Sequence, residues 1–265
     1  MWSGSRHPPY RKIKLAIIIL CRNIRDAVSI TASFFANIRL SGRCYFHKKY
    51  RPDAYTEKVF DFTGESLGVI HMNKVEQSIQ LQNIACKNRL IRSAVHSFLG
   101  NPDGTMTEAE YQMYDTLAKN QVGMIITGHC HVSPDGQANE EQIAIYDDRY
   151  IPQFARAAKI VQAQNARFIV QISHAGPRAI HNEDLTDVTA RDLKKNRQAR
   201  MLTLAEIETI RRQFIDAAVR LQKAGVDGIQ LHAAHSYLLS RFLDETFNQR
   251  EDCYGGSREN RFRLC

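Results

Sequence analysis

Hydrophobic positions along the chain alternate between short continuous runs and helical spacings from about residue 81 onward. Runs bounded by polar or glycine-rich segments are typical of strands buried in a parallel sheet. Four such runs are RLIRSAV (89–95), VGMIIT (122–127), FIVQI (168–172) and GIQL (228–231). Their alternation with helical segments predicts four strand-helix units, and hence a parallel sheet or barrel with right-handed crossovers.

Three helices are predicted between these runs, over residues 107–120, 147–165 and 203–225. The pairs Thr107 with Glu110 and Thr203 with Glu206 have the spacing of a capping box, which marks a helix start. The polar segment Pro177–Arg200 is longer than a tight connection needs, so we expect it to be functional or mobile.

The first 71 residues show no sustained hydrophobic period, which predicts a poorly structured extension (1–71) ahead of a folded domain (72–265). The extension also explains the net charge of +8, because residues 1–52 hold eleven of the 36 basic residues and only one of the 28 acidic ones. This basic tract has no platform of interleaved aromatic and basic residues, so the sequence does not predict a nucleic-acid interface.

The apolar run Leu15–Cys21 is seven residues long, whereas a membrane span needs ~20 residues, so no membrane insertion is expected. The basic residues around it leave open a minimal secretory signal, an organelle-targeting peptide or an extension with no targeting role. The six cysteines include no CxxC pair, which favours reduced thiols over a disulfide framework or a metal site. We therefore expect a cytoplasmic protein, with organelle targeting as the alternative.

The segment HAAHSYLL follows the fourth predicted strand and contains His232, His235 and Tyr237. Residues at the carboxyl ends of parallel strands line the ligand crevice, so these side chains are candidates for catalysis. Two histidines three residues apart also occur as helix caps or as hydrogen-bonded core residues, and the spacing alone leaves both interpretations open.

Five segments together resemble the Old Yellow Enzyme family, the FMN-dependent NAD(P)H:flavin oxidoreductases and ene-reductases. The most specific feature is HAAHSYL followed by Asn248, Arg250 and YGGSRENR. The segments are KNRLIRSAV (87–95), VGMIITGHCHVSPDG (122–136), IVQISHAG (169–176), AGVDGIQLHAAHSYLLSRFL (224–243) and YGGSRENRFR (254–263). The resemblance implies an α/β fold, a partial (β/α)8 TIM barrel of about four βα units.

By this resemblance, the chain reduces activated C=C bonds of α,β-unsaturated carbonyl compounds with FMN, and NADH or NADPH is the reductant. His232 and His235 would donate hydrogen bonds to the substrate carbonyl oxygen, where negative charge develops. Tyr237 would deliver a proton to the α-carbon. The Asn260–Arg261 pair of YGGSRENR is expected to stabilise the loop after the fourth strand.

The resemblance also implies a set of flavin-binding residues. The backbone of Ser93, Ala94 and Val95 would face the flavin, and Gln171 would pair with its pyrimidine edge through one donor and one acceptor. Without the motif, two structural roles are equally consistent with the sequence. Gln171 could cap the end of its strand, and Tyr237 could be an aromatic residue packed in the core. The remaining flavin-binding candidates are His96, His129 and His232.

Several positions depart from the family pattern, among them His96, His129 and Ser236. His96 stands where members commonly have Thr or Cys. His129 replaces a residue that is often small and close to the flavin ring, so its imidazole is expected to crowd the ring. Ser236 replaces the usual Gly, which would strain the turn if the φ angle there is positive.

The chain contains four of the eight expected strands, and flavin phosphate is generally held by loops after strands seven and eight of such barrels. An open half barrel exposes sheet edges, so we expect another chain to cover them. The alternative to an enzyme is a truncated, non-catalytic remnant without cofactor. The exact substrate, the choice of NADH or NADPH and the oligomeric state do not follow from the sequence.

Overall fold

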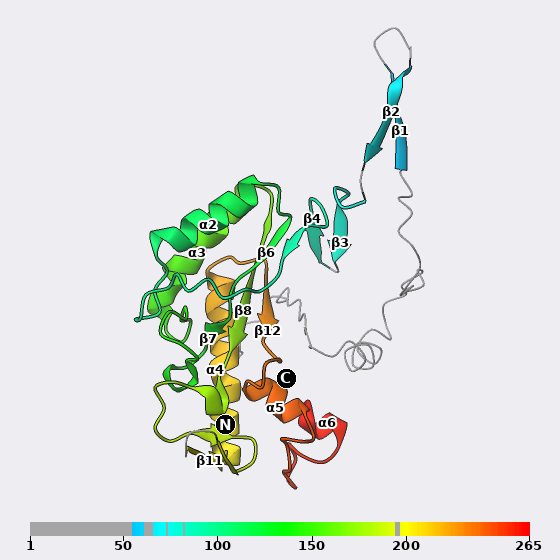
Figure 1. Ribbon diagram of the computed structural model, residues 1–265. Helices are drawn as coiled ribbons and strands as arrows, with labels where there is room; N and C mark the ends of the chain where they lie inside the picture. The colour runs from blue at the N-terminus through cyan, green and yellow to red at the C-terminus, as the bar shows by residue number, and fades with distance from the viewer. Residues whose placement is uncertain (1–54, 61–65, 73, 82, 194–196) are drawn as a thin grey trace, which may run out of the picture.

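The computed structural model describes residues 55–60, 66–72, 74–81, 83–193 and 197–265 (Figure 1). The basic tract and its candidate targeting segment lie outside these residues. Two strands, β1 (Tyr55–Phe60) and β2 (Ser66–Met72), pair as an antiparallel hairpin that stands apart from the main sheet. The division of the chain between residues 71 and 72 stays a prediction.

The largest sheet in the described residues is parallel and follows chain order. Its strands are arranged β5-β6-β8-β12, and a short strand, β7, also pairs with β8. Their bounds are β5 (Ile91–Arg92), β6 (Met124–Ile126), β7 (Cys130–His131), β8 (Arg167–Ser173) and β12 (Gly228–Leu231). A sheet whose strands never reverse their order is typical of a (β/α) barrel, whereas a doubly wound sheet has a switch point. The predicted partial barrel is confirmed.

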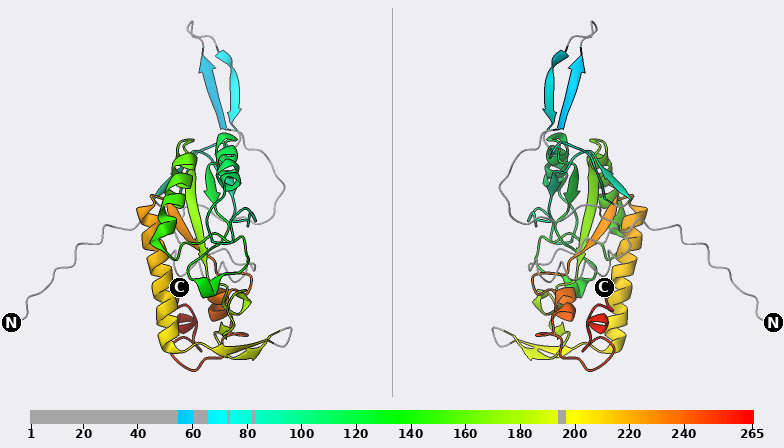
Figure 2. Two further views of the ribbon diagram at one scale, coloured as in Figure 1. Left: turned by 90° about the vertical axis from the view of Figure 1, so that its left-hand side faces the viewer. Right: turned by 90° about the vertical axis from the view of Figure 1, so that its right-hand side faces the viewer.

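Three helices connect these strands and cover one face of the sheet. They are α2 (Glu108–Lys119), α3 (Ile151–Gln162) and α4 (Leu204–Lys223). Helix α3 contacts both α2 and α4, and each helix contacts at least one strand of the sheet. Figure 2 shows α4 running along the side of the sheet.

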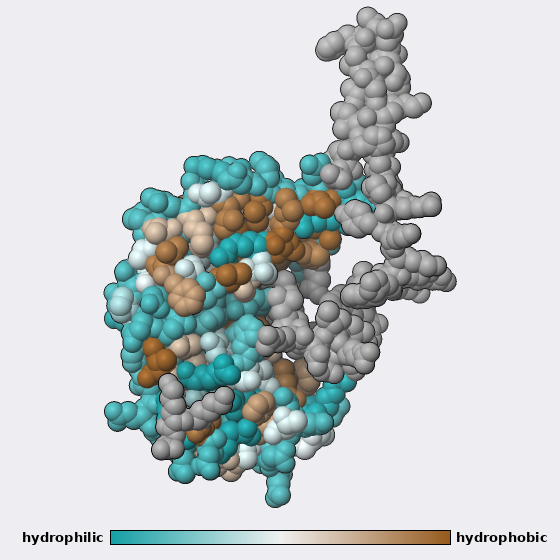
Figure 3. All heavy atoms as spheres, viewed as in Figure 1, coloured by the Kyte–Doolittle hydropathy of each residue, from teal (hydrophilic) through white to brown (hydrophobic). Residues whose placement is uncertain are grey.

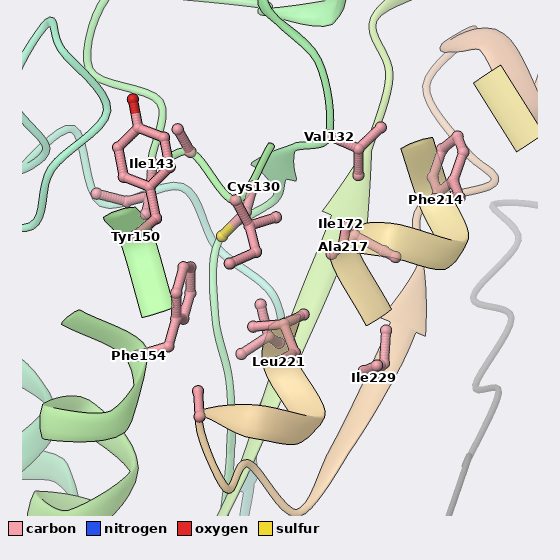
Figure 4. Packing of buried hydrophobic residues seen from close by; sticks show 14 of the residues in the cluster. Cys130, Val132, Ile143, Tyr150, Phe154, Ile172, Phe214, Ala217, Leu221 and Ile229 are labelled. Carbon is pink, nitrogen blue, oxygen red and sulfur yellow. The ribbon is translucent and has the colours of Figure 1, made fainter. Parts of the chain in front are cut away.

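The main core lies between this helix layer and the outward-facing residues of the strands (Figure 4). On β8, Phe168, Val170 and Ile172 face the helices, and they belong to one buried cluster with Phe154 and Leu221. Because side chains alternate along a strand, the residues between them face the barrel interior.

The interior face is apolar at the N-terminal end of the strands. Met124, Ile126 and Ile169 form a second buried cluster with Ile84 and Cys86. The last two residues belong to β4 (Ile84–Cys86), which pairs with β3 (Ile79–Leu81) in an antiparallel hairpin. The hairpin therefore closes this end of the half barrel. Figure 3 shows apolar residues gathered in the region where Figure 1 draws β3, β4 and β6.

The first strand is shorter than predicted. Its pairing with β6 stops at Arg92, whose guanidinium donates a 3.1 Å hydrogen bond to the Ile126 carbonyl oxygen. Ile126 lies beyond the end of the β5–β6 pairing, so the Arg92 side chain supplies a donor that the short strand does not.

Only one of the two predicted capping boxes is complete. At α4, Thr203 and Glu206 each bond the backbone of the other. At α2, Thr107 caps the helix, but the prediction for Glu110 is wrong. Its buried carboxylate instead accepts hydrogen bonds from Ser97 and Tyr114.

The polar segment after β8 forms a small sheet that its hydrophobic pattern did not predict. The strands are β9 (Thr186–Asp187), β10 (Arg191–Asp192) and β11 (Gln198–Met201), in the order β10-β11-β9. The segment begins with a 3-10 turn, η3 (Gly176–Arg178). The fully buried Asp187 forms ion pairs with Arg241 and Arg191, so charge pairing adds to the small apolar cluster of Ala175, Ala179, Leu185 and Ala199.

Shorter elements complete the described fold. They are η1 (Pro134–Gly136), η2 (Asp148–Tyr150), α5 (Leu238–Leu243) and α6 (Arg258–Arg261). The expected loop-stabilising role of the Asn260–Arg261 pair is confirmed, because these side chains donate to the carbonyl oxygens of Gly255 and Leu243. Among the helices within the described ranges, none combines the length and apolarity that crossing a bilayer requires.

Candidate active site

The sequence-predicted site residues meet at the C-terminal ends of the parallel strands. His232 directly follows β12, and its backbone N–H donates to the Ile172 carbonyl oxygen of β8 at 2.9 Å. His96 and His129 follow β5 and β6. A Cβ at Gly128 would lie 3.1 Å from His96 Cα, so the glycine allows these two strand ends to approach closely.

Four imidazoles and one phenol form a continuous cluster at this edge. The His129 ring stacks on His232 with a centroid distance of 5.4 Å and lies 5.2 Å from His96. His232 lies 5.1 Å from His235, and the Tyr237 ring contacts both His232 (4.9 Å) and His129 (5.3 Å). The three candidate catalytic residues are thus side by side, although their chemical roles stay predictions.

Burial keeps the enclosed members of the cluster uncharged. Burial, with a smaller effect from His235, lowers the pKa of His232 to about 4. Burial and the neighbouring His232 lower the pKa of His129 to about 3. Burial raises the pKa of Tyr237, so its phenol keeps its proton. At neutral pH these rings are therefore hydrogen-bond donors without a charge of their own.

The turn that carries the second histidine is strained. His235 and Ser236 have φ angles of 58° and 56°, in the left-handed region that non-glycine residues rarely occupy. Because the φ angle of Ser236 is positive, a serine in place of the usual glycine strains this turn, as expected. The turn places exposed His235 beside buried His232, and Tyr237 then begins α5 as its N-cap residue.

Two glutamines lie next to this cluster on the interior face. Gln171 Nε2 donates a 2.6 Å hydrogen bond to Gln230 Oε1, and the two residues are paired across β8 and β12. Both side chains are buried. Sequence reasoning missed Gln230. It alternates with Gly228 and with His232, which follows β12, so the period of two along the strand could have placed it on the same face as His232.

Three buried polar atoms at this edge have no hydrogen-bond partner among the described residues: His96 Nε2, Gln230 Nε2 and His232 Nε2. Buried polar atoms are normally satisfied, so this group of unpartnered atoms indicates a ligand position. The donor set matches a flavin, because the amide pair offers groups for a pyrimidine edge and the imidazole offers a donor for an anionic oxygen.

The first-strand candidates line the open edge of the sheet. Ser93 and Val95 are exposed, and Ala94 packs partly against the cluster under the β3–β4 hairpin. Val95 uses its carbonyl oxygen to accept from Arg92, at 3.3 Å. Within the described ranges, no group of His, Cys, Asp or Glu side chains has the arrangement of a metal site.

Comparison with known proteins agrees with this architecture. The model of the NADH:flavin oxidoreductase / NADH oxidase family matches residues 76–265. The chain belongs to this family. The match covers every strand of the parallel sheet together with the imidazole cluster.

Among curated members of the family, a probable NADH-dependent flavin oxidoreductase, YqiG, of Bacillus subtilis is 37% identical over 184 residues, covering 67% of this chain and 49% of that protein. An NADH oxidase of Thermoanaerobacter brockii is 35% identical, covering 70% of this chain and 29% of the relative. The chain thus spans at most about half the length of these two relatives.

Solved structures also resemble this chain. An Old Yellow Enzyme from Pichia sp. is 27% identical with a TM-score of 0.67, covering 72% of this chain and 54% of that one. A 2-naphthoyl-CoA reductase in complex with 2-naphthoyl-CoA is 25% identical with a TM-score of 0.68, covering 72% and 32%. Each of these structures therefore shares the fold of most of this chain.

Proposed function

We propose that the protein is an FMN-dependent NAD(P)H oxidoreductase that reduces activated C=C bonds of α,β-unsaturated carbonyl compounds. The observation that carries the proposal is the cluster at the ends of the parallel strands, in which the His232 ring contacts both His235 and the phenol of Tyr237. Family membership supports the same chemistry.

The imidazoles are suited to stabilise charge that develops on a carbonyl oxygen. The neutral ring of His232 donates a hydrogen bond and carries no charge that would hold the ground state equally tightly, so it favours the enolate-like transition state, and His235 lies beside it as a second donor. The orphaned Nε2 of buried His232 is the donor that this role requires.

Tyr237 supplies the proton at the neighbouring carbon. Its raised pKa keeps the phenol protonated until the α-carbon becomes basic. The ring contacts His232, so one substrate can reach both the oxygen donors and the proton donor. When bound, FMN supplies the hydride that it has taken from NADH or NADPH.

Gln171 and Gln230 would hold the pyrimidine edge of FMN, and the backbone of Ser93–Val95 would face its ring. The amide pair already orders both side chains, and the free Nε2 of Gln230 gives the edge a donor. The phosphate and the rest of the substrate pocket would depend on barrel strands beyond those in the described sheet.

The open edge of the sheet supports a covering partner. Leu90, Ile91, Val95 and Phe98 are exposed along β5 and the segment after it, with Phe98 at 65% exposure. An exposed apolar strand edge favours association, so we propose that further barrel strands or another chain cover it.

The direct test uses the purified full chain mixed with FMN and gel-filtered. We expect a yellow protein that releases FMN on denaturation and, with oxygen excluded, turns over NADH or NADPH only when an enone such as cyclohexenone is present as the electron acceptor. A colourless protein under excess FMN would instead support the alternative, a non-catalytic remnant of an enzyme of this family.

A further inference from the structure

His129 is held at one ring nitrogen by a buried amide. Gln142 is fully buried, and its Oε1 accepts a 2.6 Å hydrogen bond from the backbone N–H of Ala138. Because this bond fixes which end of the amide is the oxygen, the NH2 end must face His129. Gln142 Nε2 lies 2.7 Å from His129 Nδ1.

The contact fixes the state of the His129 ring. An amide N–H can only donate, so Nδ1 is an acceptor and the ring proton is on Nε2. The two protons of the same Gln142 NH2 group are shared among Nδ1, the His129 carbonyl oxygen (3.1 Å) and Ser173 Oγ (3.1 Å). Ser173 Oγ lies 3.3 Å from Nδ1, so several polar contacts hold the imidazole in one orientation.

The faces of the ring are also occupied. His129 is stacked on His232 at an interplanar angle of 13°, and His96 lies 5.2 Å from it on the side of β5. Aromatic pairs in contact have centroid distances of ~4.5–7 Å, so no third ring fits between neighbours this close. The ring of His129 therefore fills the space from the end of β5 to the end of β12.

We propose that the His129 imidazole competes with the flavin ring for this space and sets the affinity of the site for FMN. The inference rests on the proposed function, which places the flavin between Ser93–Val95 on one side and Gln171 and His232 on the other. His129 must swing out before the flavin enters, and it must then give up its stacking and its bonds to Gln142 and Ser173.

The expected effect follows from the population of the open state. If the site binds FMN only when the ring has moved, the apparent dissociation constant rises in inverse proportion to the open fraction. Replacing His129 with Ala removes the competitor. The buried Gln142 amide keeps two acceptors, the His129 carbonyl oxygen and Ser173 Oγ, so this change leaves no orphaned donor.

The test is an FMN titration of the full chain followed by quenching of flavin fluorescence, for the wild type, His129→Ala and His129→Ser. We expect both variants to bind FMN about tenfold or more tightly than the wild type. The matched control is His181→Ala, which removes an exposed imidazole outside the cluster and leaves the affinity unchanged. The His129→Ser variant offers the Gln142 amide a hydroxyl oxygen in place of Nδ1. It therefore keeps the test valid if the His129→Ala variant does not fold.

Melting temperatures without and with FMN separate a ring-blocking role from a structural one. If His129 were only structural, the variants would melt differently without FMN and would gain no affinity. A wild type that binds FMN as tightly as both variants would overturn this inference alone. Absence of FMN binding in all three proteins would overturn both the inference and the proposed function.

Discussion

The two ends of the interior sheet face are built from the same strands but are completed in different ways. At the N-terminal end, Ile169 and its neighbours are covered by the β3–β4 hairpin. At the C-terminal end, Gln230 and His232 retain buried donors with no partner in the described residues. One end is thus closed by packing, whereas the other has polar groups that a ligand would satisfy. Residues at the N-terminal end therefore stabilise the fold, whereas residues at the C-terminal end are available to bind a ligand.

The sharpest test of the polar end is His232→Ala in the FMN-loaded protein. Losing one preorganised donor to a developing oxyanion lowers kcat by about 10²–10³-fold. Steady-state enone reduction measures the loss, and His181→Ala is the control. If kcat stayed within twofold, roughly the scatter of context effects, His232 would not be the oxyanion donor.

The apolar end is tested by Ile169→Ala. Ile169 is fully buried in the cluster under the hairpin, so the cavity lowers the free energy of unfolding by about 2–5 kcal/mol. Urea denaturation measures the change. Ile180→Ala, at a position 39% exposed, is expected to change stability by about 0.5 kcal/mol or less. Equal effects at the two positions would show that the hairpin does not seal this face.

The polar end also predicts how stability depends on pH. The pKa of His232 is about 4 in the folded protein, against 6.5 for an unperturbed histidine. Between these two pKa values, His232 binds more protons in the unfolded chain than in the folded protein. The free energy of unfolding therefore decreases as the pH falls from 6.5 to 4. Above pH 6.5, His232 is neutral in both states and no longer affects stability. The contribution of His232 reaches about 3 kcal/mol at most.

Urea denaturation at several pH values measures this slope. His232→Gln, which has no proton to gain, is expected to flatten the curve, while His129 still contributes through its pKa of about 3. An unchanged slope in the variant would mean that the imidazole of His232 is solvated in the folded protein.

The smallest effect is expected at the turn that carries His235. Ser236 has a φ angle of 56°, which glycine adopts without steric cost, so Ser236→Gly raises the free energy of unfolding by about 1 kcal/mol. Ser240→Gly lies inside α5 and is expected to lower stability. A loss of stability in Ser236→Gly would show that the side chain, and not the backbone, determines this turn.

Elements with a strong periodic pattern were predicted with little error. The strand at Gly228–Leu231 has its predicted bounds, and the Thr203–Glu206 capping box is present as expected. Both signals are local, because side-chain alternation and capping depend on residues a few positions apart.

Features that depend on tertiary partners were not predicted. Glu110 has the spacing of a capping residue, yet the hydroxyl groups of Ser97 and Tyr114 attract its carboxylate into the core. Gln142 carried no motif, and its role became visible only when the fold placed it against His129. Spacing along the chain does not reveal which distant group will compete for a side chain.

The Glu110 contacts make α2 and the loop after β5 one mechanical unit. Ser97, which Glu110 binds, is adjacent to His96, so a helix on the outer surface fixes a wall of the imidazole cluster. Barrel enzymes are often recombined by exchanging strand-loop-helix modules between relatives. In this chain, a crossover point between residues 97 and 110 would separate Glu110 from Ser97, the loop residue that it binds. Such a crossover should be avoided when chimaeras are designed.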